Sequence, residues 1–181
     1  MPTVYYTGKG DKGTTNLIGA GSIPKDNPLF FAIGTIDELN SNIGIALFYI
    51  HNEKMRSMLE AIQNDLFIIG AELASSLTKD GSIKKLDESK TKRLEANIEE
   101  LGGSLPELKK FVLPNGCEGA VHLHVARSVA RRAERELVVA SKGYKISPEV
   151  LKYINRLSSF LFVAALYLNK LEGVDERHPN Y

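Results

Sequence analysis

The sequence predicts an all-α fold, a mostly up-and-down bundle of five helices in a single domain. Five segments carry apolar residues spaced three and four apart, short connections join them, and no strand-rich region competes. A chain of 181 residues with 43% hydrophobic content can build one compact core. Residues 1–181 are therefore expected to form one helical-bundle domain, with residues 1–25 leading into it and residues 174–181 as a loose polar tail.

The first helix is expected over residues 28–50. Asp26 or Asn27 would cap it, and Pro28 suits its opening turn because the missing N–H is harmless there. Its expected core stripe consists of Phe31, Ile33, Ile36, Leu39, Ile43 and Leu47. Asp37 and Glu38 fall inside this apolar pattern. A buried carboxylate there would need a partner such as an arginine, whereas the plainer interpretation is an acid on the helix surface.

The second helix is expected from about residue 54 to residue 77, with apolar residues of the same period. The third, over residues 87–101, is the most polar of the five, and its thin apolar stripe predicts an outer position in the bundle. Gly102 and Gly103 are expected to end this helix in a left-handed conformation.

The fourth helix, expected over residues 119–141, carries a charged stripe at helical spacing. The stripe consists of Arg127, Arg131, Glu134 and Arg135, and the apolar residues expected on the opposite side are Val125, Val129, Ala133 and Leu137. Guanidinium groups pair with phosphate oxygens in two-point geometry, and a glutamate among them can hold a guanidinium or complete the coordination shell of a metal ion. The alternative is an ordinary solvated charged face.

The fifth helix is expected over residues 148–171, with Ser147 as its cap and Pro148 in its first turn. Asn155 and Arg156 interrupt its apolar pattern. One of them is therefore expected to face a site or a partner subunit, unless Arg156 simply extends its side chain into solvent.

Two loops are candidate ligand sites. Gly8, Gly10 and Gly13 allow backbone N–H groups to approach a ligand, and Lys9 adds charge, so this loop can bind phosphates or be a flexible terminal turn. It lacks the lysine and the preceding strand of a Walker motif. The second loop places Phe111 beside a Pro-Asn-Gly turn, where the ring could face a ligand or pack inward.

Composition excludes several functional classes. A net charge of +1 is too small for a general nucleic-acid binder. The single cysteine excludes an internal disulfide and a multi-cysteine zinc site. No apolar run reaches the ~18 residues of a membrane span. The expected location is therefore the cytoplasm. No Glu-x-x-His pair occurs, which argues against a di-metal bundle.

Five motifs follow one another along nearly the whole chain. They are T-G-K-G-D-K-G-T-T at residues 7–15 with Pro24-Lys25, G-T-I-D-E-L-N at 34–40, F-V-L-P-N-G at 111–116, L-H-V-A-R-S-V-A-R-R-A-E-R at 123–135, and N-R-L-S-S-F-L-F-V at 155–163. In this order and spacing, the sequence resembles the PduO-type ATP:cob(I)alamin adenosyltransferases, the corrinoid adenosyltransferases that make coenzyme B12.

The resemblance implies a five-helix bundle that assembles as a homotrimer with an active site at each subunit interface. The substrates would be ATP and cob(I)alamin, with Mg²⁺ near Glu134 and the phosphates. A reductase and a B12-dependent enzyme would be the protein partners. The residues implied in ATP binding are Thr7, Gly8, Lys9, Gly10, Thr15, Asn16 and Lys25 from one subunit, and Arg131, Arg132, Glu134, Arg135 and Asn155 from the next.

In this family the cobalt of cob(I)alamin attacks the 5′ carbon of ATP and expels triphosphate. The resemblance implies that Arg131 stabilises this leaving group and that Arg127 pairs with Asp37 across the interface. Phe111 would pack under the corrin, displace the lower ligand and leave the cobalt four-coordinate.

The sequence departs from the family pattern at three points. Lys9 lies at a different step of the glycine-rich loop, Ser159 stands where aspartate is common, and Leu166 stands where arginine is common. The last two changes remove charge near the corrin or the interface. A helical module that binds ATP or delivers B12 without catalysis is the alternative, and a nucleic-acid-binding regulator is disfavoured by the charge balance.

Overall fold

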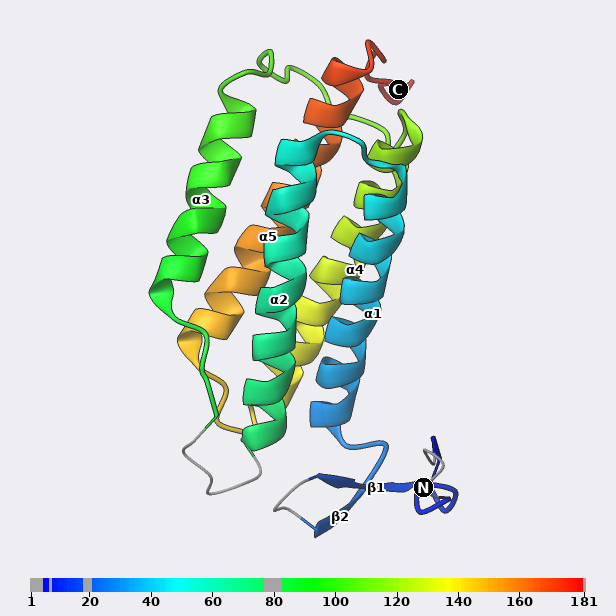
Figure 1. The fold of residues 1–181 in the computed structure, drawn as a ribbon, viewed down its shortest axis with the longest axis vertical. Helices are drawn as coiled ribbons and strands as arrows, with labels where there is room; N and C mark the ends of the chain where they lie inside the picture. Colours follow the sequence, from blue (N-terminus) through cyan, green and yellow to red (C-terminus); the bar gives the residue numbers. More distant parts are fainter. Residues whose placement is uncertain (1–4, 7, 18–20, 77–82, 181) are drawn as a thin grey trace.

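A computed structural model describes residues 5–6, 8–17, 21–76 and 83–180 of the chain. In these ranges it contains five long helices, which are α1 (Pro28–Tyr49), α2 (Glu53–Ser75), α3 (Glu88–Gly102), α4 (Glu118–Ala140) and α5 (Pro148–Leu171) (Figure 1). The predicted all-α bundle is confirmed, and the predicted helix ends agree within two residues. The expected end of the second helix, Leu77, lies outside the described residues.

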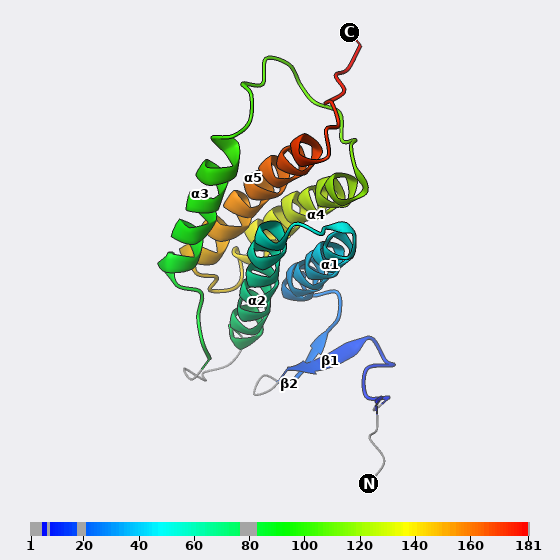
Figure 2. The same cartoon turned by 45° about the horizontal axis from the view of Figure 1, so that its top comes forward.

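The bundle is built around α4 and α5, which pack against each other. Helix α1 packs on α4, α2 packs on α1, and α3 packs on α5 (Figures 1 and 2). Helix α3 lies at the edge of the bundle in both views and buries few side chains, namely Thr91, Leu94 and Leu101. The outer position predicted for the most polar helix is therefore confirmed.

The predicted helix caps are largely confirmed. The Asn27 side chain accepts a hydrogen bond from the Leu29 N–H at 2.9 Å, and the Ser147 hydroxyl accepts one from the Val150 N–H at 3.3 Å. The left-handed end predicted at Gly103 is wrong, because its φ is −60° and its N–H still bonds to the Glu99 carbonyl at 2.9 Å. The chain thus leaves α3 through a further right-handed turn.

Two residues predicted to lie on the apolar stripes of α1 and α4 are exposed instead. Phe31 is 53% exposed and Val125 is 45% exposed, whereas Ala32 and Ala126 beside them are fully buried. Small residues occupy these positions because α1, α4 and α5 approach closely: a Cβ on Gly119 would lie 2.8 Å from the Ile50 side chain. The other predicted stripe residues of these two helices lie in or against the core, so the prediction is wrong only at Phe31 and Val125.

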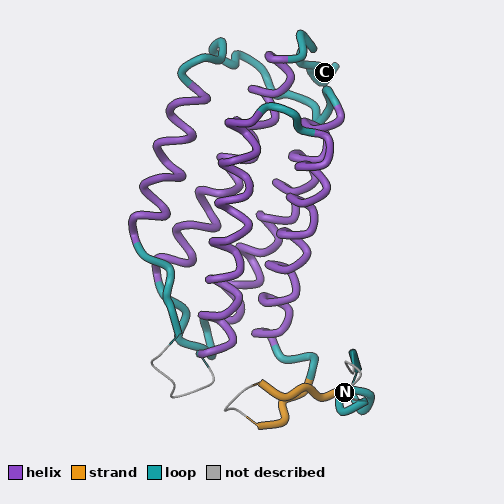
Figure 3. Tube along the Cα trace, viewed as in Figure 1, coloured by secondary structure: helices purple, strands orange, loops and turns teal. Residues whose placement is uncertain are grey.

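A short antiparallel hairpin, which the sequence did not predict, precedes the bundle. Strands β1 (Thr14–Leu17) and β2 (Gly21–Pro24) pair so that Thr14 lies opposite Pro24 (Figure 3). The hairpin projects beyond the end of the bundle at which α1 begins (Figures 1 and 2).

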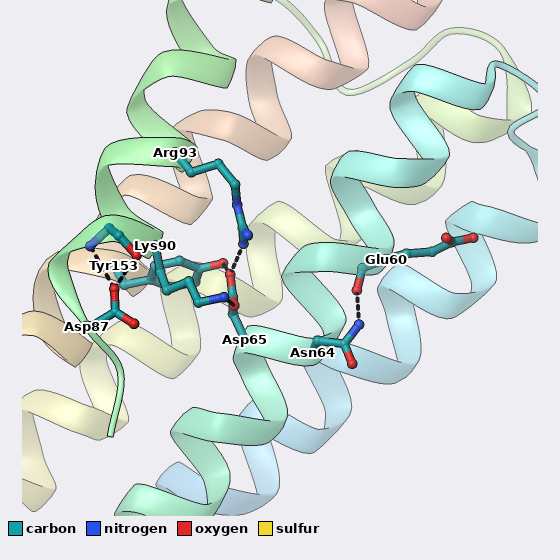
Figure 4. A network of polar contacts seen from close by, with 8 residues as sticks. Glu60, Asn64, Asp65, Asp87, Lys90, Arg93 and Tyr153 are labelled. Carbon is teal, nitrogen blue, oxygen red and sulfur yellow. Dashed lines mark hydrogen bonds and ion pairs between the residues drawn. The ribbon is translucent and has the colours of Figure 1, made fainter. Parts of the chain in front are cut away.

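A buried carboxylate joins α3 to the rest of the bundle. Asp65 on α2 is fully buried, accepts a hydrogen bond from the Tyr153 hydroxyl at 2.9 Å, and pairs with Lys90 at 3.3 Å and with Arg93 (Figure 4). Burial, followed by the Asp65 charge, raises the pKa of Tyr153, so this phenol stays protonated and donates.

Each helix in the described ranges is too short or too polar to cross a bilayer.

Candidate active site

Helix α4 presents a row of guanidinium groups that lack carboxylate partners. Arg127, Arg131 and Arg135 are four residues apart and share one face, and among the described residues none of the three forms an ion pair. The Arg127 Nε is buried without a hydrogen-bond partner. Burial and the neighbouring Arg131 charge lower the pKa of Arg127. A cationic face that no described carboxylate neutralises is suited to a polyanionic ligand.

Two hollows meet at this face and share Arg127 and Phe162. One, of about 570 Å³, is bounded by residues 108–112, which include Phe111, and the other, of about 320 Å³, is bounded by Arg131, Ser158 and Ser159. We call the two hollows together the arginine groove. Where the Phe111 loop borders it, the groove has apolar and aromatic side chains together with Lys109 and Lys110, and its other end is cationic and hydroxyl-lined.

Phe111 is 79% exposed at the rim of the arginine groove. Of the two interpretations left open by the sequence, the ring facing a ligand fits this exposure, while inward packing is wrong. An exposed phenylalanine at the mouth of a hollow offers a flat apolar surface to a planar ligand.

Glu134 and Asn155 meet at the junction of α4 and α5. The Asn155 side-chain amide donates to Glu134 at 2.7 Å and accepts from Arg156 at 3.0 Å, while Arg156 also donates to Glu95 at 2.9 Å. This chain of bonds fixes the orientation of the Asn155 amide and of the Glu134 carboxylate. The interruption of the apolar pattern at residues 155 and 156 therefore marks polar contacts between helices.

The carboxylates predicted in the first helix behave differently from each other. Glu38 pairs with Arg132 of α4, so an arginine partner does exist, but at the neighbouring acid. Asp37 is exposed, and within the described residues its carboxylate forms no ion pair in the subunit. The predicted pairing of Asp37 with Arg127 across an interface stays a prediction, because a single subunit does not test it.

The glycine-rich loop forms two successive turns before the hairpin. The Asp11 N–H bonds to the Gly8 carbonyl and the Gly13 N–H to the Gly10 carbonyl, both at 3.3 Å. Gly8 has a φ of +67°, in the left-handed region, and a Cβ on Gly10 would lie 3.1 Å from the Lys25 ammonium. Lys25 thus reaches over the second turn. Thr7 lies outside the described residues, and Asn16 is described only as part of β1.

Phe111 and the glycine-rich loop lie toward different ends of the subunit. The glycine-rich loop belongs to the hairpin that projects beyond the start of α1, whereas the Phe111 loop precedes α4 at the opposite end of the bundle (Figures 1 and 2). A single subunit therefore does not bring Phe111 and the glycine-rich loop together.

Three residues at or near the groove were not predicted as site residues. Phe162 and Ser158 line it, and His124 is buried beside it with neither ring nitrogen hydrogen-bonded. Burial, with a contribution from the Arg127 charge, lowers the pKa of His124 to about 4, so the ring is neutral near pH 7. Helical spacing could have placed Ser158 with Asn155, but nothing in the sequence distinguishes Phe162 from core residues.

Comparisons with known proteins identify the family of this chain. A family model described as cobalamin adenosyltransferase matches residues 5–168. The chain belongs to this family. The resemblance seen in the sequence is thereby confirmed.

Individual relatives extend over most of the chain. A corrinoid adenosyltransferase of Bacillus subtilis (strain 168) is 42% identical over 94% of this chain and 89% of its own length. The corrinoid adenosyltransferase PduO of Salmonella typhimurium is 38% identical over 88% of this chain and 48% of its own length, so the chain spans about half of that relative. A solved structure of a variant PduO-type ATP:corrinoid adenosyltransferase from Lactobacillus reuteri, complexed with cobalamin and ATP, has a TM-score of 0.92 at 38% identity, covering 98% of this chain and 97% of the other.

Proposed function

We propose that this protein transfers the 5′-deoxyadenosyl group of ATP to cob(I)alamin, forming adenosylcobalamin and triphosphate. The observation that carries the proposal is the arginine groove, in which unpaired guanidinium groups adjoin exposed aromatic surface, in a chain of the cobalamin adenosyltransferase family. The cationic end suits a triphosphate and the aromatic end suits a corrin ring.

The reaction needs no nucleophile from the protein. The electron pair of cobalt(I) forms the bond to the 5′ carbon of ATP, the bond from that carbon to the triphosphate oxygen breaks, and its electrons leave with triphosphate. The residues of the chain position the two substrates and neutralise the charge that grows on the leaving oxygen. We assign this role to Arg131 and Arg135, whose guanidinium groups have no carboxylate partner among the described residues.

We assign Phe111 to the lower face of the corrin. Its exposed ring would exclude a lower axial ligand and water from the cobalt, and a four-coordinate cobalt(II) is easier to reduce to the reactive cobalt(I) state. The ring stands on the groove wall that also contains Phe162. Two departures from the family pattern lie in different surroundings. Ser159 borders the cationic end of the arginine groove, whereas the Leu166 side chain is buried.

A Mg²⁺ ion bound to ATP is compatible with Glu134. Magnesium sites commonly combine one or two carboxylates with phosphate oxygens and water, and Glu134 offers one carboxylate held by Asn155. Among the described residues no three His, Cys, Asp or Glu side chains cluster as metal ligands, so ATP phosphates would have to supply the other ligands. The ion would help neutralise the triphosphate.

The active unit is proposed to be a homotrimer, with the glycine-rich loop of one subunit facing the arginine helix of the next. Residues 7–10, Thr15, Asn16 and Lys25 would then contact ATP together with residues 131–135 and Asn155. Exposed apolar side chains on α1 and α4 support this arrangement, namely Phe31, Ile45, Phe48, Val121 and Val125.

The Asp37–Arg127 pair would span this interface. Changing either residue to alanine should lower both turnover and the trimer fraction, and the double change should be milder than the sum of the single changes. Analytical ultracentrifugation together with the rate assay tests this pair. Trimers and rates that stay intact in both single variants would eliminate it.

The experiment that tests the proposed function is an anaerobic assay with chemically reduced cobalamin, ATP and Mg²⁺. Loss of the cob(I)alamin absorbance with formation of adenosylcobalamin and triphosphate in equal amounts is the expected result. Tight ATP binding by calorimetry without turnover would instead favour a delivery role. In the cell, the proposal places the protein in the cytoplasm, with a reductase that supplies cob(I)alamin and a B12-dependent enzyme that receives the product.

A further inference from the structure

The loop that carries Phe111 has no regular secondary structure of its own. It runs over residues 103–117 between α3 and α4. An exposed side chain on such a segment holds a defined position only if other parts of the chain fix the backbone beneath it. The contacts of this loop therefore determine where the Phe111 ring stands.

The first fixed point is Asn169, a fully buried residue near the end of α5. Its side-chain oxygen accepts from the Cys117 N–H at 3.0 Å, and its amide nitrogen donates to the Asn115 carbonyl at 3.2 Å and to Glu176 at 3.0 Å. A carbonyl and a carboxylate can only accept, so these partners define the orientation of the amide. Both donor hydrogens and one acceptor position of this amide are used.

Gly116 allows this contact to form. Its φ is +135°, and a Cβ built on it would lie 1.9 Å from the Asn169 side-chain oxygen. The Pro-Asn-Gly turn thus wraps directly onto the amide, and any larger residue at position 116 would push the two apart.

The second fixed point is the segment that follows α5. The Arg177 carbonyl accepts from the Leu113 N–H at 2.8 Å, and the His178 Nδ1 lies 2.8 Å from the carbonyl oxygen of Phe111 itself. The Val174 N–H returns to the Asn169 carbonyl at 2.8 Å. Residues 174–178, for which the sequence suggests a loose tail, thus make hydrogen bonds on both sides of position 112.

We infer that Asn169, Glu176, the backbone of residues 174–177 and the His178 ring form a clamp that positions the Phe111 loop for the corrinoid substrate. None of these groups borders the arginine groove, so they act through Phe111 and are positioning residues. The inference rests on the proposed function, because it assigns the clamp to the corrinoid and leaves ATP binding to other residues.

The experiment compares four variants with the unmodified protein. A chain that stops after Gly173 removes the segment, and Glu176→Ala removes one acceptor of the Asn169 amide. Glu176→Gln keeps an acceptor oxygen and should restore the contact. Glu172→Ala is the matched control, since Glu172 is exposed near the end of α5 and its side chain forms no described hydrogen bond or ion pair. Circular dichroism verifies that each variant is folded.

The first readout is amide hydrogen exchange of residues 105–117, which requires no substrate. Faster exchange in the truncated chain and in Glu176→Ala, with unmodified rates in Glu176→Gln and Glu172→Ala, is the expected result. Unchanged exchange in the truncated chain would show that the loop does not depend on the clamp and would overturn the inference.

The second readout separates the two substrates. We expect kcat/KM for the corrinoid to fall about tenfold or more in the truncated chain and in Glu176→Ala, with the KM for ATP unchanged. The spectrum of four-coordinate cob(II)alamin bound to these variants should weaken in parallel. Equal losses for ATP and corrinoid, or no loss despite faster exchange, would overturn the inference. If the unmodified protein forms no adenosylcobalamin, the proposed function fails, and the clamp loses its assigned role even if the exchange result stands.

Discussion

Replacing the buried Asp65 by asparagine should destabilise the protein strongly without changing its shape. The carboxylate is fully buried between α2, α3 and α5 and faces Lys90, Arg93 and the Tyr153 hydroxyl (Figure 4). Asparagine has the same size and can still accept from Tyr153, but it leaves two cations without their anion.

The contacts of Asp65 set the expected magnitude. Removing one partner of a buried ion pair costs about 3–5 kcal/mol. Because the Lys90 and Arg93 side chains are 24% and 39% exposed, water can solvate them after the change, and we expect the lower end of this range, about 3 kcal/mol. At about 2–4 °C per kcal/mol for a chain of this length, Tm should fall by about 6–12 °C.

Urea unfolding followed by circular dichroism measures this loss. Glu60→Gln is the matched control, because it makes the same chemical change on the same helix at an exposed pair with Arg56, where the cost should stay below about 0.5 kcal/mol. If Asp65→Asn costs no more than Glu60→Gln, the buried network does not hold α3 in place.

Three further changes test the site and its surroundings. Arg131→Ala should lower kcat about 100-fold or more with the unfolding curve unchanged, and full turnover at saturating ATP would refute leaving-group stabilisation. Gly116→Ala should lower the free energy of unfolding by about 3 kcal/mol or more, because the added Cβ would collide with Asn169. Gly173→Ala is the control: Gly173 has a φ of +66° but open space around it, so its loss should be about 1–2 kcal/mol. Similar urea midpoints for the two variants would contradict the close contact. His124 has an ordinary pKa of 6.5 when unfolded but about 4 when folded, so the unfolded chain takes up the proton first, and stability should fall by about 2 kcal/mol between pH 7 and pH 5. Urea titrations should show this loss largely abolished in His124→Phe, and an equal loss in both proteins would exclude the ring as its source.

The fold could be predicted from the sequence because local signals agreed with one another. Apolar spacing, Asn27 and Ser147 as caps, and proline in the first turn of two helices all indicated the same helix boundaries, and the structure confirms them. The hairpin was missed because its strands have four residues each and follow a loop rich in glycine, so no alternating pattern is long enough to be recognised.

The site could be predicted less completely. Spacing placed Arg127, Arg131 and Arg135 on one face, and the resemblance to a family indicated Phe111, which lies exposed at the groove. The partner of Arg132 was not foreseen, because a pair between α4 and α1 depends on how the two helices are rotated against each other. Asn169 was missed for a different reason, since two of its partners lie in a loop 52 and 54 residues away along the chain.

The clamp on the Phe111 loop also has a consequence for synthesis of the protein. Its contacts join residues that are 52 to 67 positions apart, with the loop made first. A ribosome adds about 5–20 residues per second, so the loop waits about 3–13 seconds before Asn169 and His178 exist. During that interval α1, α2 and α4 can already associate while the Phe111 ring has no fixed position. The first helices can therefore assemble before the corrinoid side of the groove is complete, at an earlier stage of synthesis.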